Sequence, residues 1–128
     1  MDKEVRLDLP CEPANVAVVR DEVADLARSV GAEIDDVRIA VGEAAGNAVL
    51  HAYRGARAGM IRVRARFARD RLLVTVADDG VGMKPNPDSR GLRMGISLIT
   101  TLCEDVRFIS SDTGTTVSMS FAASGESA

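Results

Sequence analysis

Two polar side chains, Glu43 and Asn47, interrupt a stretch of the sequence in which apolar residues dominate. The stretch runs from Asp35 to Tyr53 and reads DDVRIAVGEAAGNAVLHAY. A carboxylate can accept a proton from an attacking hydroxyl group or water. A neutral amide oxygen suits a hard cation such as Mg²⁺, which keeps several water ligands and binds substrate phosphates. The pair is therefore compatible with phosphoryl chemistry, and an internal polar pair that ties the helix to a neighbouring loop would explain the same spacing.

Asp35 to Tyr53 is predicted to form a helix, capped by Asp35, that presents these side chains on one side. At about 100° per residue, Glu43, Asn47 and His51 fall within an arc of roughly 80°. A helix that is apolar nearly all round is usually buried, and a buried polar group needs a hydrogen bond, a metal or a ligand to offset its desolvation. We interpret His51 as a packed or capping residue, because the sequence offers no partner that would activate it.

Three glycine-containing motifs follow this helix. DDGVGM (residues 78–83) comes directly after a predicted strand, GLRMG (91–95) precedes a short predicted helix, and GTT (114–116) enters the last predicted strand. Glycines let the backbone approach a ligand closely. The free N–H groups at a helix start favour phosphate binding. Each motif taken alone is also explained as an ordinary turn.

The elements that must position these motifs form an α+β two-layer sandwich. Alternating apolar residues predict strands at Val5–Leu9, Ile61–Phe67, Leu72–Ala77, Val106–Ile109 and Thr115–Phe121. Apolar residues at helical spacing predict a helix from Pro13 to Val30 that ends at Gly31, and a short third helix spans Gly95–Leu102. Arg69–Asp70 reads as a hairpin turn. Because two strand pairs are hairpins, we expect a mixed, mostly antiparallel sheet with the helices on one face.

Composition sets further limits on the function. The 128 residues are expected to form a single domain (1–128), with a core at about 4–121 and a flexible tail at 122–128. A net charge of −3 and the absence of Trp favour neither direct nucleic-acid binding nor a membrane surface. Cys11 and Cys103 lack metal-ligand spacing and are interpreted as reduced core residues. No signal peptide or membrane span is evident, so we expect a cytoplasmic protein.

In order and spacing, the motifs ExxxNAxxHAY, DDGVGM, GLRMG and GTT resemble the N, G1, G2 and GT boxes of the GHKL superfamily. Its Bergerat-type ATP-binding fold is shared by gyrase, the chaperone Hsp90, histidine kinases and MutL. The resemblance covers residues 4–121 and includes the predicted order of elements. The short length and the wording EAxxNAxxHAY are similar to the anti-sigma-factor serine/threonine kinases of bacterial partner-switching systems.

The resemblance implies a role for each matched residue. Glu43 would be the general base, and Asn47 would bind Mg²⁺. Asp78 would bind the adenine amine, and Thr115 would support the adenine end directly or through water. The residues that would shape the pocket, the ATP lid and the phosphate site are Gly80, Gly82, Met83, Arg90, Gly91, Arg93, Met94 and Gly95.

The implied function is that of a MgATP-dependent protein serine kinase. It would bind and inhibit a sigma factor, phosphorylate a STAS-type anti-sigma-factor antagonist, and form a homodimer. An alternative is an ATP-binding regulatory module that docks to a phosphatase or another regulator without kinase activity. Two other members of the superfamily fit this sequence less well. A detached histidine-kinase catalytic domain is disfavoured because we see no phospho-accepting dimerisation helices, and a gyrase-like ATPase is disfavoured because we see no transducer domain.

Seven arginines lie between Arg54 and Arg71 in an otherwise acidic chain. They are consistent with the solvent face of a hairpin. They are also consistent with a basic surface for an acidic protein partner, because the helices would cover only the other face of the sheet. For nucleic acid as the partner, the sequence offers neither an aromatic platform on which bases could stack nor a helix that could read a groove.

Overall fold

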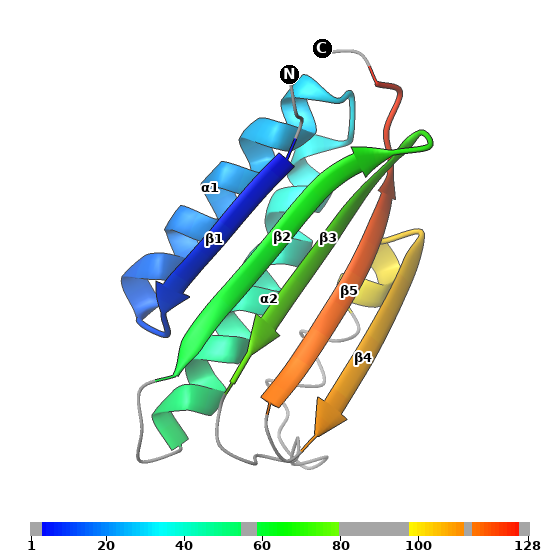
Figure 1. The fold of residues 1–128 in the computed structure, drawn as a ribbon. Helices are drawn as coiled ribbons and strands as arrows, with labels where there is room; N and C mark the ends of the chain where they lie inside the picture. The colour runs from blue at the N-terminus through cyan, green and yellow to red at the C-terminus, as the bar shows by residue number, and fades with distance from the viewer. Residues whose placement is uncertain (1–3, 55–58, 80–97, 112–113, 126–128) are drawn as a thin grey trace.

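The computed structural model describes residues 4–54, 59–79, 98–111 and 114–125. Within these ranges, a layer of helices covers one face of an antiparallel sheet (Figure 1). The elements are β1 (Glu4–Pro10), α1 (Pro13–Ser29), α2 (Ile34–Arg54), β2 (Met60–Ala68), β3 (Arg71–Asp78), β4 (Asp105–Ser111) and β5 (Gly114–Ala122). Residues 98–102 are also helical and form the described end of the predicted third helix. The predicted fold class is confirmed.

The sheet has the strand order β1-β2-β3-β5-β4, and every neighbouring pair in it is antiparallel. The hairpin between β2 and β3 turns at Arg69 and Asp70, whose φ angles are 53° and 60°. Two consecutive positive φ angles are typical of a type I′ turn, whose twist matches that of the flanking strands. The predicted hairpin is therefore confirmed, and β5 is inserted between β3 and β4.

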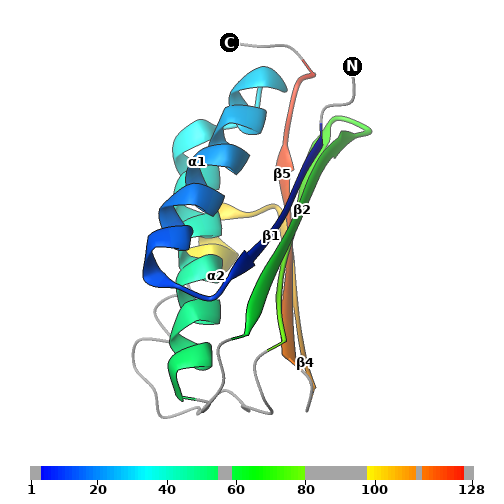
Figure 2. The same cartoon turned by 60° about the vertical axis from the view of Figure 1, so that its left-hand side comes forward.

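Strict alternation along β2 explains which face of the sheet is buried. Ile61, Val63 and Ala65 are buried under the helices, whereas the arginines between them are exposed. Because successive strand side chains point to opposite faces, one face becomes core and the other remains open. Figure 2 shows both long helices on the same side of the sheet.

Helix α1 ends as its sequence predicts. Its buried stripe includes Val19, Val23 and Leu26. Gly31 follows with φ 70°, and the N–H of Ala32 donates to the carbonyl of Ala27 at 3.0 Å. This bond from C″ back to C3 is the hallmark of a Schellman ending, in which glycine adopts the left-handed conformation at little cost.

Helix α2 begins one residue earlier than predicted. The carbonyl of Glu33 accepts the first helical bond, from the N–H of Val37 at 3.1 Å, so Glu33 occupies the cap position. Asp35 lies in the first turn. The prediction that Asp35 caps the helix is therefore wrong, although its charge still favours the positive end of the helix dipole.

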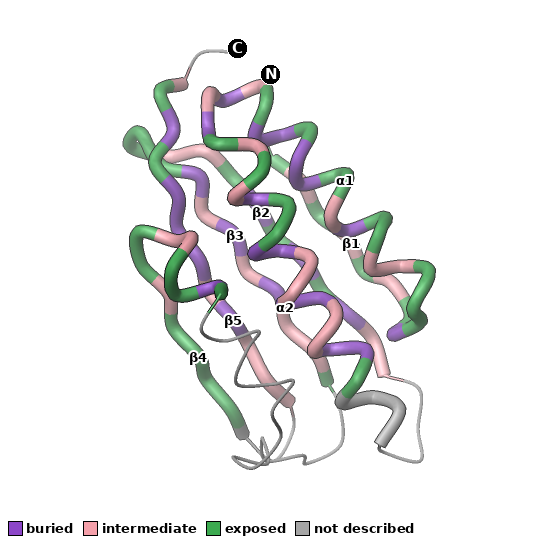
Figure 3. The backbone as a smooth tube through the Cα atoms, turned by 180° about the vertical axis from the view of Figure 1, so that it is seen from behind, coloured by how far each residue is buried: buried purple, intermediate pink, exposed green. Residues whose placement is uncertain are grey.

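The burial of α2 is one-sided, contrary to what its apolar sequence predicts. Val37, Val41, Ala45 and Ala48 are buried, but other apolar side chains of the helix remain exposed to solvent. Figure 3 shows that α2 contains buried, intermediate and exposed residues along its length. Ile39 is 45% exposed, and Leu50 is 42% exposed. The helix therefore carries a packed face and an accessible face, and polar residues on its flanks are not fully desolvated.

The residues that follow β5 are tied to the helical layer. Ala123 is buried and forms an isolated antiparallel bridge with Ala32. The N–H of Gly125 donates to the carbonyl of Val30 at 2.8 Å. The segment for which the sequence predicts flexibility, from Ala122 onward, thus makes backbone hydrogen bonds as far as Gly125. Residues 126–128 lie outside the described part.

Candidate nucleotide site

Two of the predicted motifs meet at one end of the sheet. Asp78, the last residue of β3, lies directly opposite Thr115 on β5. By strand alternation, both side chains share the helix-facing side with Val76 and Val117, and Asp78 is half-buried. The C-terminal end of α2 reaches the same end of the molecule as the end of β3 and the start of β5 (Figure 1).

Gly114 explains why a glycine precedes Thr115. Its φ is +147°, and a Cβ at this position would lie 1.9 Å from the carbonyl oxygen of Asp78. No side chain fits at this distance, so the backbones of β3 and β5 can approach only if residue 114 is glycine. The GTT motif and the DDG motif are therefore one structural unit.

The two aspartates of DDGVGM have different surroundings. The carboxylate of Asp79 accepts a hydrogen bond from the backbone N–H of Met60 at 2.6 Å and thereby anchors the start of β2. Asp79 is exposed, whereas Asp78 faces the helical layer. Of the two, Asp78 has the better position for a ligand that enters between the sheet and α2.

Ser110 was not among the predicted site residues. Its hydroxyl lies 3.0 Å from the hydroxyl of Thr115, which it faces across β4 and β5. Either hydroxyl can donate this bond. The two residues flank the β4–β5 turn, and the exact register of that hairpin determines that their side chains meet.

Glu43 and Asn47 lie one turn apart on α2, and both are half-buried. Their neighbours Ala44 and Ala48 are buried. Helix α2 packs against β2, β3 and β5, so the two polar residues flank the packed face of the helix whose C-terminal end lies at the same end of the molecule as Asp78 and Thr115. The side chain of His51 lies outside the described part of the structure.

The predicted lid and phosphate site also lie outside the described residues. These predictions concern Gly80, Gly82, Met83, Arg90, Gly91, Arg93, Met94 and Gly95. The described half of the candidate site therefore consists of Glu43, Asn47, Asp78 and Thr115.

The carboxylates at this end of the molecule affect the pKa of a buried thiol, that of Cys11. Burial, together with the smaller effect of the Asp78 and Asp79 carboxylates, raises the pKa of Cys11 to about 11. Cys11 is buried, and its N–H donates to the carbonyl of Gly59 at 2.8 Å. The thiol therefore stays protonated near neutral pH and is a packing group beside the site, and it is unpaired as predicted.

The candidate metal ligand, the side-chain amide of Asn47, fits a magnesium ion that binds together with its nucleotide. Among the described residues, no group of three or more His, Cys, Asp or Glu side chains is placed to hold a metal. Mg²⁺ usually keeps several waters and takes one or two protein ligands together with substrate phosphates. A half-buried amide such as that of Asn47 meets this modest requirement.

The fold and the site define a class of protein. Residues 9–121 match the family described as the histidine kinase-like ATPase domain, and the chain belongs to this family. Similar curated proteins narrow this assignment to a type of kinase within the family. It is 32% identical to the serine-protein kinase RsbW of Bacillus licheniformis, over 90% of this chain and 82% of the relative. It is 31% identical to the protein of the same name from Bacillus subtilis, over 95% of this chain and 87% of the relative. At this identity and coverage, the chain is a member of the RsbW-type serine-protein kinase family.

Solved structures agree with the fold. The RsbU and RsbW domains of Rv1364c from Mycobacterium tuberculosis superpose with a TM-score of 0.73 at 21% identity, covering 97% of this chain and 33% of that longer one. The blue-light activated histidine kinase EL346 of Erythrobacter litoralis gives a TM-score of 0.60 at 22% identity, covering 87% of this chain and 41% of that one. Within the described residues, no helix is long and apolar enough to cross a membrane.

Proposed function

We propose that this protein is a MgATP-dependent serine kinase that phosphorylates an anti-sigma-factor antagonist and binds and inhibits a sigma factor. The observation that supports the nucleotide site is the pairing of Asp78 with Thr115, which requires glycine at position 114, at the end of the sheet that the C-terminal end of α2 also reaches. Family membership supports the serine-directed transfer.

In this proposal, the adenine end of ATP binds at the Asp78–Thr115 pair. The Asp78 carboxylate accepts a hydrogen bond from the exocyclic amine. The hydrogen bond between Ser110 and Thr115 fixes the hydroxyl of Thr115, which supports the adenine end directly or through water. Gly80 and Gly82 leave room for the base. The β3–β5 backbone contact at Gly114 makes this end rigid before nucleotide arrives, which lowers the entropic cost of binding.

Transfer then takes place toward the accessible flank of α2. The serine hydroxyl oxygen of the antagonist forms a bond to the γ-phosphorus, the bond from that phosphorus to the bridging oxygen breaks, and ADP leaves with the electron pair. Glu43 receives the proton of the serine hydroxyl. Bound to Asn47 and the phosphates, Mg²⁺ would neutralise charge on the phosphate oxygens. Most of the rate enhancement in such transfers comes from positioning and charge neutralisation.

The half-burial of Glu43 suits this role. A fully buried carboxylate would not reach a protein substrate, and a fully exposed one would not be held in place. Arg90 and Arg93 of the proposed lid supply positive charge for the phosphates, and Gly91 to Gly95 supply backbone N–H groups. The proposal also includes a homodimer that acts in the cytoplasm.

Transfer of labelled phosphate from ATP to the purified cognate antagonist tests the proposal. Glu43→Gln keeps the size of the side chain but removes its basicity, so transfer should fall by about 100-fold or more while ATP affinity is retained. Glu22→Gln changes an exposed carboxylate on α1 and should transfer as the parent protein does. Parent-like transfer by both Glu43→Gln and Glu43→Ala would exclude Glu43 as the base.

A second measurement separates the kinase from a pure binding module. A module that only docks to a regulator would bind MgATP, but it would leave the antagonist unlabelled even in the parent protein. In a sigma-factor pull-down, the parent should retain the sigma factor with ATP and release it when unphosphorylated antagonist is added.

A further inference from the structure

The side chain of Asp79 links the end of one strand to the start of its neighbour in the sheet. Asp79 follows Asp78, the last residue of β3, and is exposed. Its carboxylate accepts a hydrogen bond from the backbone N–H of Met60, the first residue of β2, at 2.6 Å. A carboxylate acceptor makes such a bond stronger than one between two neutral groups. The proposed kinase reaction assigns no role to this contact.

The bond extends the pairing of β2 with β3 by one position. The register pairs Ile61 with Asp78, and the next pair in the same register would be Met60 with Asp79. Strand β3 ends at Asp78, so at this position a side chain, rather than a backbone carbonyl, accepts the N–H of Met60. The Asp79 carboxylate therefore ties the backbone just beyond Asp78 to β2.

Strand β5 holds the same stretch of backbone from the opposite side. Asp78 lies opposite Thr115. Gly114 approaches so closely that an added Cβ would lie 1.9 Å from the carbonyl oxygen of Asp78 and 3.1 Å from the Cα of Asp79. Because the backbone sets the direction of each Cα–Cβ bond, holding residues 78 and 79 between two strands also sets the direction in which the Asp78 side chain leaves the sheet.

The exposure of Asp79 separates this role from a contribution to global stability. If the carboxylate were removed, water could reach the N–H of Met60 and replace the lost hydrogen bond. A water molecule would satisfy the donor, but it would not tie residue 79 to β2. The loss of the Asp79 side chain should therefore change the geometry at Asp78 more than it changes the free energy of unfolding.

We propose that Asp79 is a positioning residue for nucleotide recognition, which sets the direction of the Asp78 carboxylate through its hydrogen bond to Met60 and so contributes to the preference for adenine. This inference rests on the proposed binding of the adenine amine at Asp78. A hydrogen bond weakens steeply when it is misaligned. An acceptor that meets a single exocyclic amine therefore gains from a backbone that is ordered before the nucleotide binds.

A direct contact of Asp79 with the base fits the structure less well. Its carboxylate is already engaged by Met60, and the residue is exposed, whereas Asp78 is half-buried and faces the helical layer. A purely structural role, in which the bond only stabilises the start of β2, predicts a different result, because it would weaken the binding of every nucleotide equally. The two roles can therefore be separated by changing the base.

Calorimetry with two nucleotides tests the inference on the full chain. One nucleotide is ATP, and the other is purine riboside triphosphate, in which hydrogen replaces the exocyclic amine. The parent should bind ATP at least about tenfold more tightly than the analogue, because only ATP offers a donor to Asp78. In Asp79→Ala, ATP affinity should fall by about tenfold, because the Asp78 carboxylate is misaligned. Affinity for the analogue should stay within about twofold of the parent value.

A conservative variant and the kinetics of transfer add two independent readouts. Asp79→Asn keeps a side-chain oxygen that can accept the N–H of Met60, so its ATP affinity should return to within about threefold of the parent value. In transfer assays, Asp79→Ala should show a raised KM for ATP and the parental kcat, because Asp78 binds the adenine end and not the reacting phosphate. Its Tm should remain close to that of the parent.

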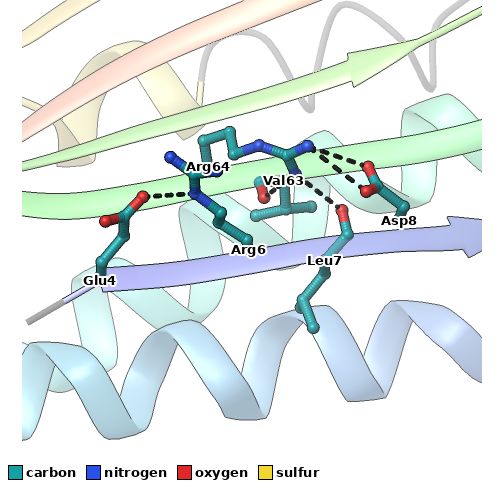
Figure 4. A network of polar contacts seen from close by, with 6 residues as sticks. All are labelled: Glu4, Arg6, Leu7, Asp8, Val63 and Arg64. Atoms are coloured by element: carbon teal, nitrogen blue, oxygen red, sulfur yellow. Dashed lines mark hydrogen bonds and ion pairs between the residues drawn. The ribbon is translucent and has the colours of Figure 1, made fainter. Parts of the chain in front are cut away.

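Asp8→Ala is the matched control. Like Asp79, Asp8 is an exposed aspartate whose side chain links two strands of the sheet. Its carboxylate accepts two hydrogen bonds from Arg64 of β2, at 3.2 and 3.3 Å (Figure 4). Asp8 lies on β1, which is separated from β3 by β2. The substitution removes a charge and a link between strands, and ATP affinity should stay within about twofold of the parent value.

Three results would overturn the inference. The first is parent-like ATP affinity in Asp79→Ala, and the second is an equal loss of affinity for both nucleotides, which would indicate a structural role alone. The third is failure of Asp79→Asn to restore ATP affinity, which would assign the effect to the charge of the carboxylate. A parent protein that binds both nucleotides equally would instead refute the adenine contact at Asp78, so failure of the proposed function and failure of this inference are distinguishable.

Discussion

Replacement of Gly114 by alanine gives a sharp test of how the candidate nucleotide site is built. The added Cβ would lie 1.9 Å from the carbonyl oxygen of Asp78, and the backbone φ of +147° is one that residues with side chains rarely adopt. The start of β5 must therefore move away from the end of β3 by more than an ångström, or the backbone must leave this conformation. Strain of this kind costs about 2–4 kcal/mol.

The expected loss of stability is large enough to measure directly. For a domain of this size, about 3 kcal/mol corresponds to a fall in Tm of roughly 10–15 °C. Because the strained contact is with Asp78 itself, ATP affinity measured by calorimetry below the new Tm should also fall, by about tenfold or more. The two losses share one cause, so they should appear together.

A matched glycine variant shows whether the effect is specific. A Cβ added to Gly46 on α2 meets nothing within 4 Å. Gly46→Ala should therefore leave Tm unchanged or raise it, because alanine is more favourable than glycine in a helix by up to about 1 kcal/mol. An unchanged Tm and an unchanged ATP affinity for Gly114→Ala would refute the reasoning, because the β3–β5 contact would then not constrain the site.

Other substitutions and a labelling experiment test separate parts of the site. Asp78→Asn should abolish detectable MgATP binding in calorimetry, because the amide cannot replace the carboxylate toward the adenine amine; unchanged affinity would mean that the base binds elsewhere. Asn47→Ala should retain nucleotide but lose Mg²⁺-dependent transfer, and retained Mg²⁺-dependent turnover would exclude Asn47 as the ligand. Cys11 and Cys103 have pKa values raised from 9.0 to about 11, chiefly by burial, so at pH 8 their thiolate fraction is about 100-fold below that of an unshifted thiol. Alkylation of the folded protein should be slow by a similar factor and should rise about tenfold per pH unit up to pH 11, whereas rapid alkylation at pH 8 would contradict the assigned burial.

Local sequence patterns predict the helices and strands because side-chain alternation and backbone preferences act between neighbouring residues. Alternation in β2 separates Ile61 and Val63 from the arginines, and Gly31 ends α1 through its left-handed conformation. The segment that follows β5 is different, because its structure depends on a contact with a distant part of the chain. Ala123 lies in a small, polar stretch that reads as a frayed tail, and only its pairing with Ala32 reveals a structural role. Such a contact between distant segments leaves no local pattern.

The same distinction applies to the site. Asp78 and Thr115 were identified as separate motifs, and the antiparallel register makes them neighbours. The steric need for Gly114 depends on that register, and the contact of Ser110 with Thr115 depends on the register of β4 with β5; neither register is specified by composition or spacing. The one-sided burial of α2 was missed for a related reason: Ile39 and Leu50 are apolar, but they lie on a side of the helix that remains exposed in the tertiary structure.

The insertion of β5 between β3 and β4 has a consequence for how the chain is made. During synthesis β4 emerges before the strand that pairs with it, so its backbone donors and acceptors must wait for β5. Phe108 and Ile109, which remain 39% and 60% exposed in the finished fold, are presented without any neighbour during this interval. An unpaired apolar strand is a template for aggregation. The nascent chain is therefore most vulnerable just before its last strand emerges from the ribosome, and slower translation between β4 and β5 would prolong that risk.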